Sequence, residues 1–504
     1  MKIGIDIGGT NTDLVLVDKN KKIIGQHKEP TTSSIELAVV QGLSQLLQKE
    51  EVLPQAIEGV FIGTTHATNA ILQGRDKDLL QVGLIRIAGN HPDISPGAAW
   101  PTELRRKIIS ASETIPGGYE CHGEPITPFD ETRAEQAIDR LLTKGVEAIA
   151  VVGVFSPMNR DQEIQVLQLI KKMAGPMFPV TLSSDIGGIG FLERENATLL
   201  NSALKKVVGR GFEALEMAVK GMGVQAPLYM IHNDGSVMDM QRAIDFPIFT
   251  ISAGQTNSFR GAISLANREN AIIIDVGGTS SDIGLVTNGY PKRSCKAAKI
   301  GGVKLQFPMP DVLSLAIGGG SIVCGEKIGP ESVARELLSQ AQCFHGNVLT
   351  LTDVGVLTGH LEIAGAQCKN ISLTKPQAKA LLHSVHMQME QAIAIVKGKN
   401  SSLPVIAVGG GAALLENVLQ IPFGNVANAY GATLAEISST IDIVTSLHKR
   451  LEVLEEVRAK AITSAIEKGA LPTDVRVVNV EIIPYAYSKE ALARVIVTAA
   501  GKGS

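Results

Sequence analysis

The chain of 504 residues carries 47 Lys and Arg against 50 Asp and Glu, a formal net charge of −3, and 44% of its residues are hydrophobic. This composition excludes a disordered chain. Because the charge is balanced, the protein has no overall electrostatic field that would attract nucleic acid or an anionic membrane. The five cysteines are all more than four residues apart, which excludes CxxC metal and redox motifs, and together with an acid at position 6 they indicate a cytoplasmic protein.

The first element of the chain is repeated in its second half. Residues 3–17 read IGIDIGGTNTDLVLV, residues 272–286 read IIIDVGGTSSDIGLV, and nine of the fifteen aligned positions are identical. Each segment reads as an apolar strand, a Gly-Gly turn and a second strand, which predicts two β-hairpins of one kind. Two matched copies indicate a duplicated domain.

Between the hairpins, apolar periodicity predicts further strands and helices. We expect strands near 22–26, 59–63, 148–155, 228–232 and 248–252. We expect helices near 35–49, 161–173 and 191–220. The stretch from about 76 to 130 is rich in Gly and Pro and weakly patterned, so we interpret it as an insertion or cap.

After the second hairpin the chain contains two more glycine-rich turns and a distinct tail. Gly409, Gly410 and Gly411 follow a strand at 405–408 and precede a predicted helix at 412–419. Gly318–Ser321 is compatible either with a packing turn or with a ligand-binding one. The tail is expected to form an amphipathic helix from Asp442 to Lys468 and then two strands, 475–483 and 492–498.

The glycine turns have a chemical use. Two successive glycines let the backbone approach a ligand closely, and their N–H groups can hold an anion such as phosphate. The side chains of Thr10, Asn11 and Thr12 add donors suited to phosphate oxygens. A carboxylate at the strand end does not favour direct contact with phosphate, so Asp6 and Asp275 are expected to hold Mg²⁺ through water.

A single Gly-Gly-Thr hairpin is most often only a tight turn, but two matched copies and a third glycine run favour a site that grips one polyphosphate from both sides. Asp13 and Asp282, seven residues after each first acid, are compatible either with ligand contact or with binding turn N–H groups. No GxxxxGK[ST] or GxGxxG motif occurs, so a P-loop or a Rossmann fingerprint is not indicated.

The chain resembles the hydantoinase A/5-oxoprolinase family, within the actin, sugar-kinase and heat-shock chaperone ATPase superfamily. The segments that carry the resemblance are GIDIGGTNTD (4–13), IGTTHATNAIL (62–72), LERENATLLNSAL (192–204), IIDVGGTSSDIGLV (273–286), LAIGGGSIV (315–323) and LTLTDVGVLTG (349–359). The resemblance implies an α/β fold of two RNase H-like (actin-like ATPase) domains with a nucleotide cleft between them, plus a small C-terminal α+β appendage. The expected domains are 1–185, with the insertion at about 76–130, then 186–441 and 442–504.

The resemblance also implies ATP and Mg²⁺ as cofactors. ATP binding is assigned to residues of the three glycine turns: Gly8, Gly9, Thr10, Asn11, Thr12, Gly277, Gly278, Thr279, Ser280, Gly409, Gly410 and Gly411. Asp6 and Asp275 are expected to be catalytic through the metal. Candidate substrate contacts are Thr65, His66, Asn69, His232 and Asn233. The chain departs from the family pattern at Ile62 and across Ser252–Asn257, which leaves the identity of the substrate open.

The implied reaction is ATP-dependent phosphorylation of the carbonyl oxygen of a cyclic amide or imide, followed by ring opening. No nucleophile elbow, HExxH motif or Cys/His cluster is evident, so a second subunit is expected to assist hydrolysis, and homo-oligomerisation is left open. The alternatives are a small-molecule kinase of the same fold or an ATPase subunit with a regulatory or activating role. Cysteine spacing argues against an iron–sulfur dehydratase activator, and the tail is too small for a chaperone's peptide-binding domain.

Overall fold

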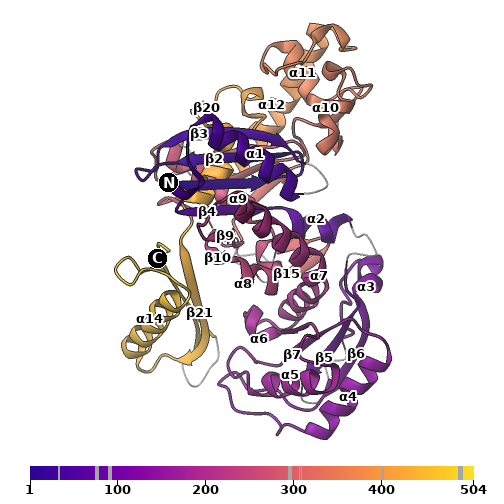
Figure 1. Ribbon diagram of the computed structural model, residues 1–504, viewed down its shortest axis with the longest axis vertical. Helices are drawn as coiled ribbons and strands as arrows, with labels where there is room; N and C mark the ends of the chain where they lie inside the picture. Colours follow the sequence, from indigo (N-terminus) through magenta and orange to yellow (C-terminus); the bar gives the residue numbers. More distant parts are fainter. Residues whose placement is uncertain are drawn as a thin grey trace.

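The computed structural model describes residues 1–503 apart from 32–34, 74–78, 89–93, 293, 295–297, 306, 308, 399–401 and 486–491. Part of the expected insertion, residues 76–78 and 89–93, therefore lies outside the described residues. The molecule is elongated, with helix α11 (Leu351–Thr358) near one end of its long axis and helices α4 (Glu131–Thr143) and α5 (Asp161–Ala174) at the other (Figure 1). The expected α/β class is confirmed.

The largest sheet has nine strands in the order β22-β23-β21-β10-β9-β4-β1-β2-β3. Its strands are β1 (Lys2–Ile7), β2 (Asn11–Val17), β3 (Ile23–Pro30), β4 (Gly59–Thr64), β9 (Leu228–Ile231), β10 (Val237–Asp239), β21 (Ile437–Ser446), β22 (Arg476–Pro484) and β23 (Leu492–Gly501). Strands β1 and β2 form the expected first hairpin, and β1, β4 and β9 run parallel. The segments that follow β1, β4 and β9 therefore leave the sheet at one edge.

A second sheet repeats this order as β13-β12-β11-β19-β20. Its strands are β11 (Ala271–Val276), β12 (Ser281–Thr287), β13 (Tyr290–Pro291), β19 (Val405–Val408) and β20 (Leu419–Gln420), with β16 (Val312–Leu315) also paired to β12. The second expected hairpin is β11–β12, in which Asp275 pairs with Asp282 as Asp6 pairs with Asp13 in the first. Strand β11 pairs in parallel with β19, as β1 does with β4. Both hairpin predictions are confirmed.

The stretch interpreted as a weakly patterned insertion instead supplies two regular strands of a third sheet. This sheet has the order β6-β5-β7-β8, with every neighbouring pair parallel. Its strands are β5 (Val82–Ile87), β6 (Ile109–Ile115), β7 (Ala148–Gly153) and β8 (Val180–Leu182). Strand β5 is wholly buried, so its residues do not alternate between apolar and polar, and the loops rich in Gly and Pro around it hide the short run.

The helices at 35–49, 161–173 and 191–220 are confirmed within one residue at each end. The helices of eight or more residues are α1 (Ile35–Lys49), α2 (His66–Gln73), α4, α5, α7 (Phe191–Gly221), α9 (Ala253–Leu265), α11, α12 (Lys375–Lys397) and α14 (Arg450–Glu467). The shorter helices are α3 (Thr102–Ile108), α6 (Ser183–Ile186), α8 (Met240–Asp245), α10 (Leu337–Gln340) and α13 (Ala427–Thr433). In the part of the chain that the structure describes, no helix is both long and apolar enough to cross a bilayer.

Three sequence predictions of secondary structure are wrong. The run expected as a strand at 248–252 is the short 3₁₀ helix η2 (Pro247–Thr250), because periodicity cannot separate a short buried apolar run in a strand from one in a helical turn. The helix expected at 412–419 is reduced to η6 (Ala412–Leu414). The helix expected from Asp442 starts only at Arg450, because β21 continues to Ser446.

The C-terminal residues extend the nine-stranded sheet. Strand β21 runs through the expected domain boundary at 441/442 and pairs with β23, which pairs with β22. Helix α14 packs on these strands through Val457, Ala461 and Ala465, which belong to one buried cluster with Val495 and Val497. Figure 1 shows this unit, coloured yellow, beside the central helices.

Helices α9 and α13 join the two hairpin sheets. Helix α13 packs on β1 and helix α9 on β11, and the two helices cross in direct backbone contact. A Cβ on Gly261 would overlap the carbonyl oxygen of Ala427 and stand 2.8 Å from its carbonyl carbon. A Cβ on Gly431 would meet the backbone of Asn257 in the same way, at 2.7 Å from its carbonyl carbon. Glycine at these two positions sets the spacing of the two halves.

Candidate active site

Two acids at matched strand positions, Asp6 and Asp275, come together from the two sheets. Burial raises the pKa of Asp6 well above its ordinary value of 3.8, and the charges of Asp13 and Asp275 raise it further. Burial also raises the pKa of Asp275 to about 6, although the side chain of Ser258 acts in the opposite direction. The two carboxylates, each partly exposed, therefore share a place that contains too little positive charge to neutralise them.

The two hairpin turns meet beside these acids. A backbone hydrogen bond closes each turn at the matching position. In the first turn Gly8 N–H donates to the Asn11 carbonyl at 3.0 Å, and in the second Gly277 N–H donates to the Ser280 carbonyl at 2.9 Å. A Cβ on Gly278 would stand 2.9 Å from Thr10 Oγ1, so the turns are in contact with each other. The structure thus brings together the hairpin residues expected to contact phosphate: Gly8, Gly9, Thr10, Asn11, Thr12, Gly277, Gly278, Thr279 and Ser280.

The third glycine turn lies against the second hairpin. Gly409 has φ +87°, and a Cβ there would overlap Asp275 Oδ1 and stand 2.5 Å from the carbonyl oxygen of Val276. Gly411 N–H donates to the same Val276 carbonyl at 2.9 Å. Residues 409–411 therefore border Asp275 and the end of β11.

The Gly318–Ser321 turn supports the second hairpin from behind. The backbone N–H groups of Gly319 and Gly320 donate to the carbonyls of Gly277 and Gly278, at 3.0 and 2.7 Å. A Cβ on Gly318 would stand 2.7 Å from Gly277 O. Of the two readings left open by the sequence, these contacts favour a packing turn.

The second acid of each hairpin has partners within the protein. Asp13 forms an ion pair with Lys28 of β3. Asp282 accepts a hydrogen bond from Gln255 Nε2 at 3.1 Å and another from the Ser314 hydroxyl. These contacts hold neighbouring strands together and favour a structural role for both acids. Thr12 is similar, since it is fully buried with its hydroxyl 3.0 Å from that of Thr31, and its expected contact with ATP stays a prediction.

Two of the candidate substrate residues lie next to the first hairpin. Thr65 N–H and its hydroxyl both donate to the carbonyl of Ile7, the last residue of β1, at 3.2 and 3.3 Å. Asn69 Nδ2 donates to Thr65 Oγ1 at 3.2 Å. His66 instead lies against helix α7, since a Cβ on Gly211 would stand 3.3 Å from its Nε2.

The other two candidates, His232 and Asn233, follow β9 at the same edge of the sheet. His232 stacks on Phe249 with ring centroids 4.7 Å apart, and its Nδ1 lies 3.0 Å from Asp234 Oδ1. Burial alone would raise the pKa of Asp234, but His232 and the hydroxyl and amide of Ser236 hold it well below its ordinary value. Asp234 therefore stays ionised and fixes the orientation of the imidazole.

His232 lines a large chamber, about 1320 Å³ in volume, between the C-terminal unit and helices α6 and α8. One wall is aromatic, with Phe249 flanked by Phe246 and Phe307 at centroid distances of 5.8 Å. The charged side chains that line the chamber are the acids Asp185, Glu193, Asp234, Asp239, Asp245, Asp442, Glu467 and Glu481 and the cations Arg242, Lys468 and Arg494. Nothing in the sequence pattern indicated this chamber, because its walls come from four separate regions of the chain.

Two buried asparagines lie on segments that contact each other, Asn233 after β9 and Asn257 in α9. Asn233 and Asn257 are 0% exposed, and their amide groups have no hydrogen-bond partner among the described residues. The backbone carbonyl of Asn233 accepts from Thr256 Oγ1 at 3.3 Å. A Cβ on Gly63 would lie 3.2 Å from Asn257 Nδ2 and 3.5 Å from Asp6 Oδ1. Asn257 lies in the stretch where the sequence departs from the family pattern, and its position beside Asp6 was not foreseen.

The residues present fit a divalent cation held in part by water. Carboxylates with raised pKa values, such as Asp6 and Asp275, gain most from a nearby cation. Among the described residues, no group of three or more His, Cys, Asp or Glu is arranged to hold a metal ion. Proteins commonly bind Mg²⁺ through one or two carboxylates, with water and substrate phosphates completing its shell, so the chemistry of Asp6 and Asp275 suits this ion.

Comparison with known families decides the classification. A family model described as the hydantoinase/oxoprolinase N-terminal region matches residues 2–174, and one described as hydantoinase/oxoprolinase matches residues 194–365. The chain belongs to the hydantoinase/oxoprolinase family. The resemblance inferred from the sequence segments is thereby confirmed.

The relatives in this family are longer than this chain. The alpha subunit of caprolactamase from Pseudomonas jessenii is 26% identical over 387 residues, which cover 71% of this chain and 54% of the relative. The gamma subunit of acetophenone carboxylase from Aromatoleum aromaticum is 28% identical over 395 residues, covering 71% and 53%. The chain thus spans about half the length of these curated relatives. The crystal structure of ATP-dependent caprolactamase from Pseudomonas jessenii has the same fold, with a TM-score of 0.74 at 20% identity over 99% of this chain and 87% of that one.

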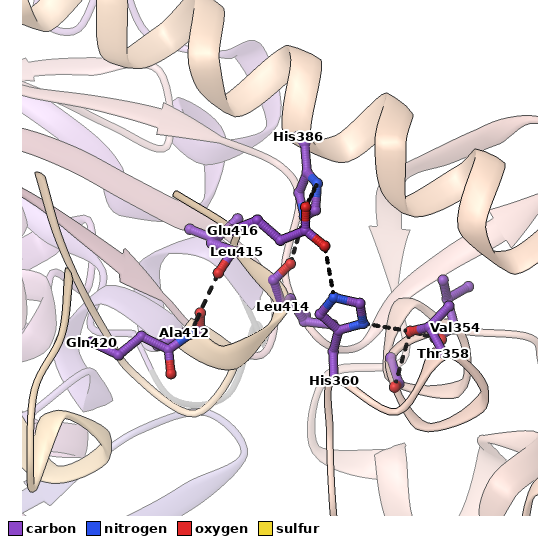
Figure 2. A network of polar contacts seen from close by, with 10 residues as sticks. Val354, Thr358, His360, His386, Ala412, Leu414, Leu415, Glu416 and Gln420 are labelled. Carbon is purple, nitrogen blue, oxygen red and sulfur yellow. Dashed lines mark hydrogen bonds and ion pairs between the residues drawn. The ribbon is translucent and has the colours of Figure 1, made fainter. Parts of the chain in front are cut away.

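A polar network anchors the segment that follows the third glycine turn (Figure 2). Glu416 Oε1 lies 3.1 Å from His360 Nε2, and its other oxygen lies 3.9 Å from His386 Nδ1. His386 Nε2 donates to the carbonyl of Leu414 at 2.7 Å. The hydrogen bond from His360 lowers the pKa of Glu416, and the charge of His386 lowers it further. The network ties residues 414–416 to helices α11 and α12 and so positions the turn at 409–411.

Replacing Glu416 with Gln should raise the KM for ATP about two- to fivefold, the scale of an exposed ion pair, and leave turnover at saturating ATP unchanged. The reason is that the substitution loosens the segment next to Gly411 without touching the paired acids. Steady-state phosphate release over a range of ATP concentrations measures the effect. Glu390→Gln, an exposed change on α12, is the matched control. An unchanged KM in Glu416→Gln would show that the network does not position the turn.

Proposed function

We propose that this chain is an ATP-dependent enzyme of the hydantoinase/oxoprolinase type, which phosphorylates the carbonyl oxygen of a cyclic amide or imide and thereby promotes ring opening. The observation that carries the proposal is the meeting of two partly buried carboxylates with raised pKa values, Asp6 and Asp275, beside two matched glycine turns. Membership of the family supports the reaction class, and ATP dependence is stated for the caprolactamase of the same fold.

In this proposal the two hairpin sheets are the cores of two RNase H-like domains, and ATP lies between them. The shared strand order of the two sheets supports this assignment. The turns are in contact, so they must separate to admit the phosphates, and helices α9 and α13 are the elements about which the halves would move. We keep 1–185, 186–441 and 442–504 as proposed units, with β21 joining the second to the third.

Mg²⁺ would be held through water by Asp6 and Asp275, and it supplies charge neutralisation for the triphosphate. The backbone N–H groups of the turns at 8–12 and 277–280 orient the phosphates, and those at 409–411 face the nucleoside. The amide oxygen forms a bond to the γ-phosphorus as the bond from that phosphorus to the β–γ bridging oxygen breaks, which leaves ADP and an imidate phosphate. Water then adds to the imidate carbon, and the C–N bond breaks as nitrogen gains a proton, which leaves an acyl phosphate. A second water hydrolyses the acyl phosphate to a carboxylate and free phosphate. No base is needed for the first step, because the amide oxygen carries no proton.

A small-molecule kinase is the second candidate, because His232 backed by Asp234 is the kind of base that an alcohol acceptor needs. A kinase would leave a stable phosphorylated product, whereas the amide reaction releases free phosphate. An ATPase subunit that regulates or activates another protein would release ADP and phosphate without converting a second small-molecule substrate.

The decisive experiment is Mg-ATP turnover against a panel of cyclic amides with all products identified. We expect the purified chain alone to hydrolyse ATP slowly and to open no ring, and a co-encoded partner to couple ATP use to ring opening. Relatives named as subunits support the expectation of a partner. Ring-opened product matching phosphate one to one without a partner would contradict the two-subunit proposal, and a phosphorylated alcohol as the only product would favour the kinase.

A further inference from the structure

Helix α9 reaches both of the paired acids through two neighbouring side chains. The hydroxyl of Ser258 donates a hydrogen bond to Asp275. The amide of Asn257, the preceding residue, lies close to Asp6 on the other side of Gly63. The helix packs on β4 of the nine-stranded sheet and on β11 of the second sheet, so these two side chains are presented to the acids from one rigid element.

The amide group of Asn257 is buried without a partner. The residue is 0% exposed, and neither its Nδ2 nor its Oδ1 has a hydrogen-bond partner among the described residues. Buried polar groups in native proteins are nearly always paired, and an exception calls for a functional explanation such as a bound ligand. An apolar side chain of the same branched shape would avoid the cost of the unpaired amide. The asparagine therefore lowers the stability of the nucleotide-free protein.

The space beside this amide is kept open because residue 63 has no side chain. Gly63 pairs with Asp6 in the parallel register of β4 and β1. A Cβ on Gly63 would stand 3.2 Å from Asn257 Nδ2 and 3.5 Å from Asp6 Oδ1, so it would fill the space between the amide and the acid. The turn at 8–12 begins two residues after Asp6. The amide, the acid and the first glycine turn therefore lie at one edge of the sheet.

A neutral hydrogen-bond donor suits this place. In the proposed function Asp6 and Asp275 hold Mg²⁺, and an amide N–H can bind an anionic oxygen without adding to the charge around the cation. The metal ion in phosphoryl transfer bridges oxygens of the β- and γ-phosphates, and the γ-phosphate is the group that is transferred. A donor next to the acid that holds the metal is thus placed to contact this end of the triphosphate.

We propose that the side-chain amide of Asn257 donates a hydrogen bond to the γ-phosphate of ATP and so helps the site to distinguish ATP from ADP. The assignment rests on the proposed function for the placement of the triphosphate beside Asp6. Asn257 lies in the stretch where the chain departs from the family pattern, so the contact is assigned to this chain and not to the family.

Calorimetric titration of the full chain in the presence of Mg²⁺, with ADP and with the non-hydrolysable analogue AMPPNP, measures what the γ-phosphate contributes to binding. Asn257→Leu should weaken AMPPNP binding at least about tenfold, the scale of one hydrogen bond between a neutral donor and a charged group, and leave ADP binding unchanged. Without nucleotide the same variant should unfold at a higher urea concentration than the wild type, because it removes an unpaired buried amide. Ser264→Ala, at an exposed position of the same helix, is the matched control.

Gly63→Ala tests the contact from the opposite side. It leaves Asn257 in place and puts a methyl group 3.2 Å from Nδ2, in the space assigned to the phosphate oxygen. This variant should also weaken AMPPNP binding more than ADP binding. Because the two substitutions lie on different elements, the same selective loss in both supports a ligand contact at this place and not a change in helix α9 alone.

Other results overturn the assignment. Unchanged AMPPNP binding in Asn257→Leu would show that the amide contacts no phosphate, and equal losses for ADP and AMPPNP would place it on Mg²⁺ or the β-phosphate. A urea midpoint below that of the wild type, with both nucleotides lost, would show that Asn257 is only structural. The proposed function fails separately. A wild-type chain that binds neither nucleotide would remove the ATP site itself, whereas a selective loss of AMPPNP binding in a protein that opens no ring would leave the contact standing without the reaction.

Discussion

Asp6→Asn and Asp275→Asn should each lower Mg-ATP turnover about 10²–10³-fold, the scale seen when one preorganised electrostatic group is removed from an active site. Each substitution deletes one of the two negative charges that would hold Mg²⁺ and its waters, while the amide keeps the shape of the side chain. Phosphate release by the purified variants measures the effect. Asp311→Asn, an exposed acid of the second half that pairs with Lys292, should retain full turnover.

The stability of Asp275→Asn at different pH values distinguishes a lost metal ligand from misfolding. Because burial raises the pKa of Asp275 from 3.8 to about 6, its ionised form destabilises the nucleotide-free protein, fully above about pH 6 and not at all below about pH 3.8. Asp275→Asn should therefore unfold at a higher denaturant concentration than the wild type at pH 7.5, by about 1–2 kcal/mol, with the gap closing as the pH falls toward 4. Wild-type turnover in either variant would refute the role of these acids, and lost turnover with lowered stability would point to misfolding.

The hairpins could be predicted because their signals are local. Alternating apolar residues on both sides of a Gly-Gly turn define a strand pair, and the second copy fixes which positions correspond. Asp6 and Asp275 therefore occupy the same register in their sheets. That the third glycine turn would reach Asp275 rests on the parallel pairing of β19 with β11, which sequence spacing does not specify.

The chamber could not be predicted because no local pattern connects its parts. His232 follows β9, Arg242 lies in α8, and Lys468 ends a helix more than two hundred residues later. They meet only because β21 pairs with β10 and thus adds the C-terminal strands to the first sheet. The sequence suggested an appended unit at 442–504, but the continuous strand β21 places that unit along one wall of the chamber.

Gly261→Ala and Gly431→Ala should each destabilise the protein by about 3 kcal/mol or more, because the added methyl meets backbone atoms that cannot move away as a side chain would. The contacts lie where α9 crosses α13, and α9 also carries Asn257 and Ser258, which lie beside Asp6 and Asp275. Forcing the helices apart should therefore reduce ATP turnover together with stability. Urea midpoints and phosphate release, measured on the same preparations, test both effects.

Gly209→Ala is the matched control for this prediction. Gly209 lies inside helix α7, and a Cβ there would have its nearest neighbour, Ile244 Cγ2, at an ordinary 3.5 Å. The substitution should stabilise the protein by about 0.5–1 kcal/mol, because alanine loses less backbone freedom than glycine in a helix. If Gly261→Ala and Gly431→Ala were as stable as Gly209→Ala, the crossing of α9 and α13 would accommodate an added methyl group. The close approach of α9 and α13 would then not set the distance between the two halves of the site.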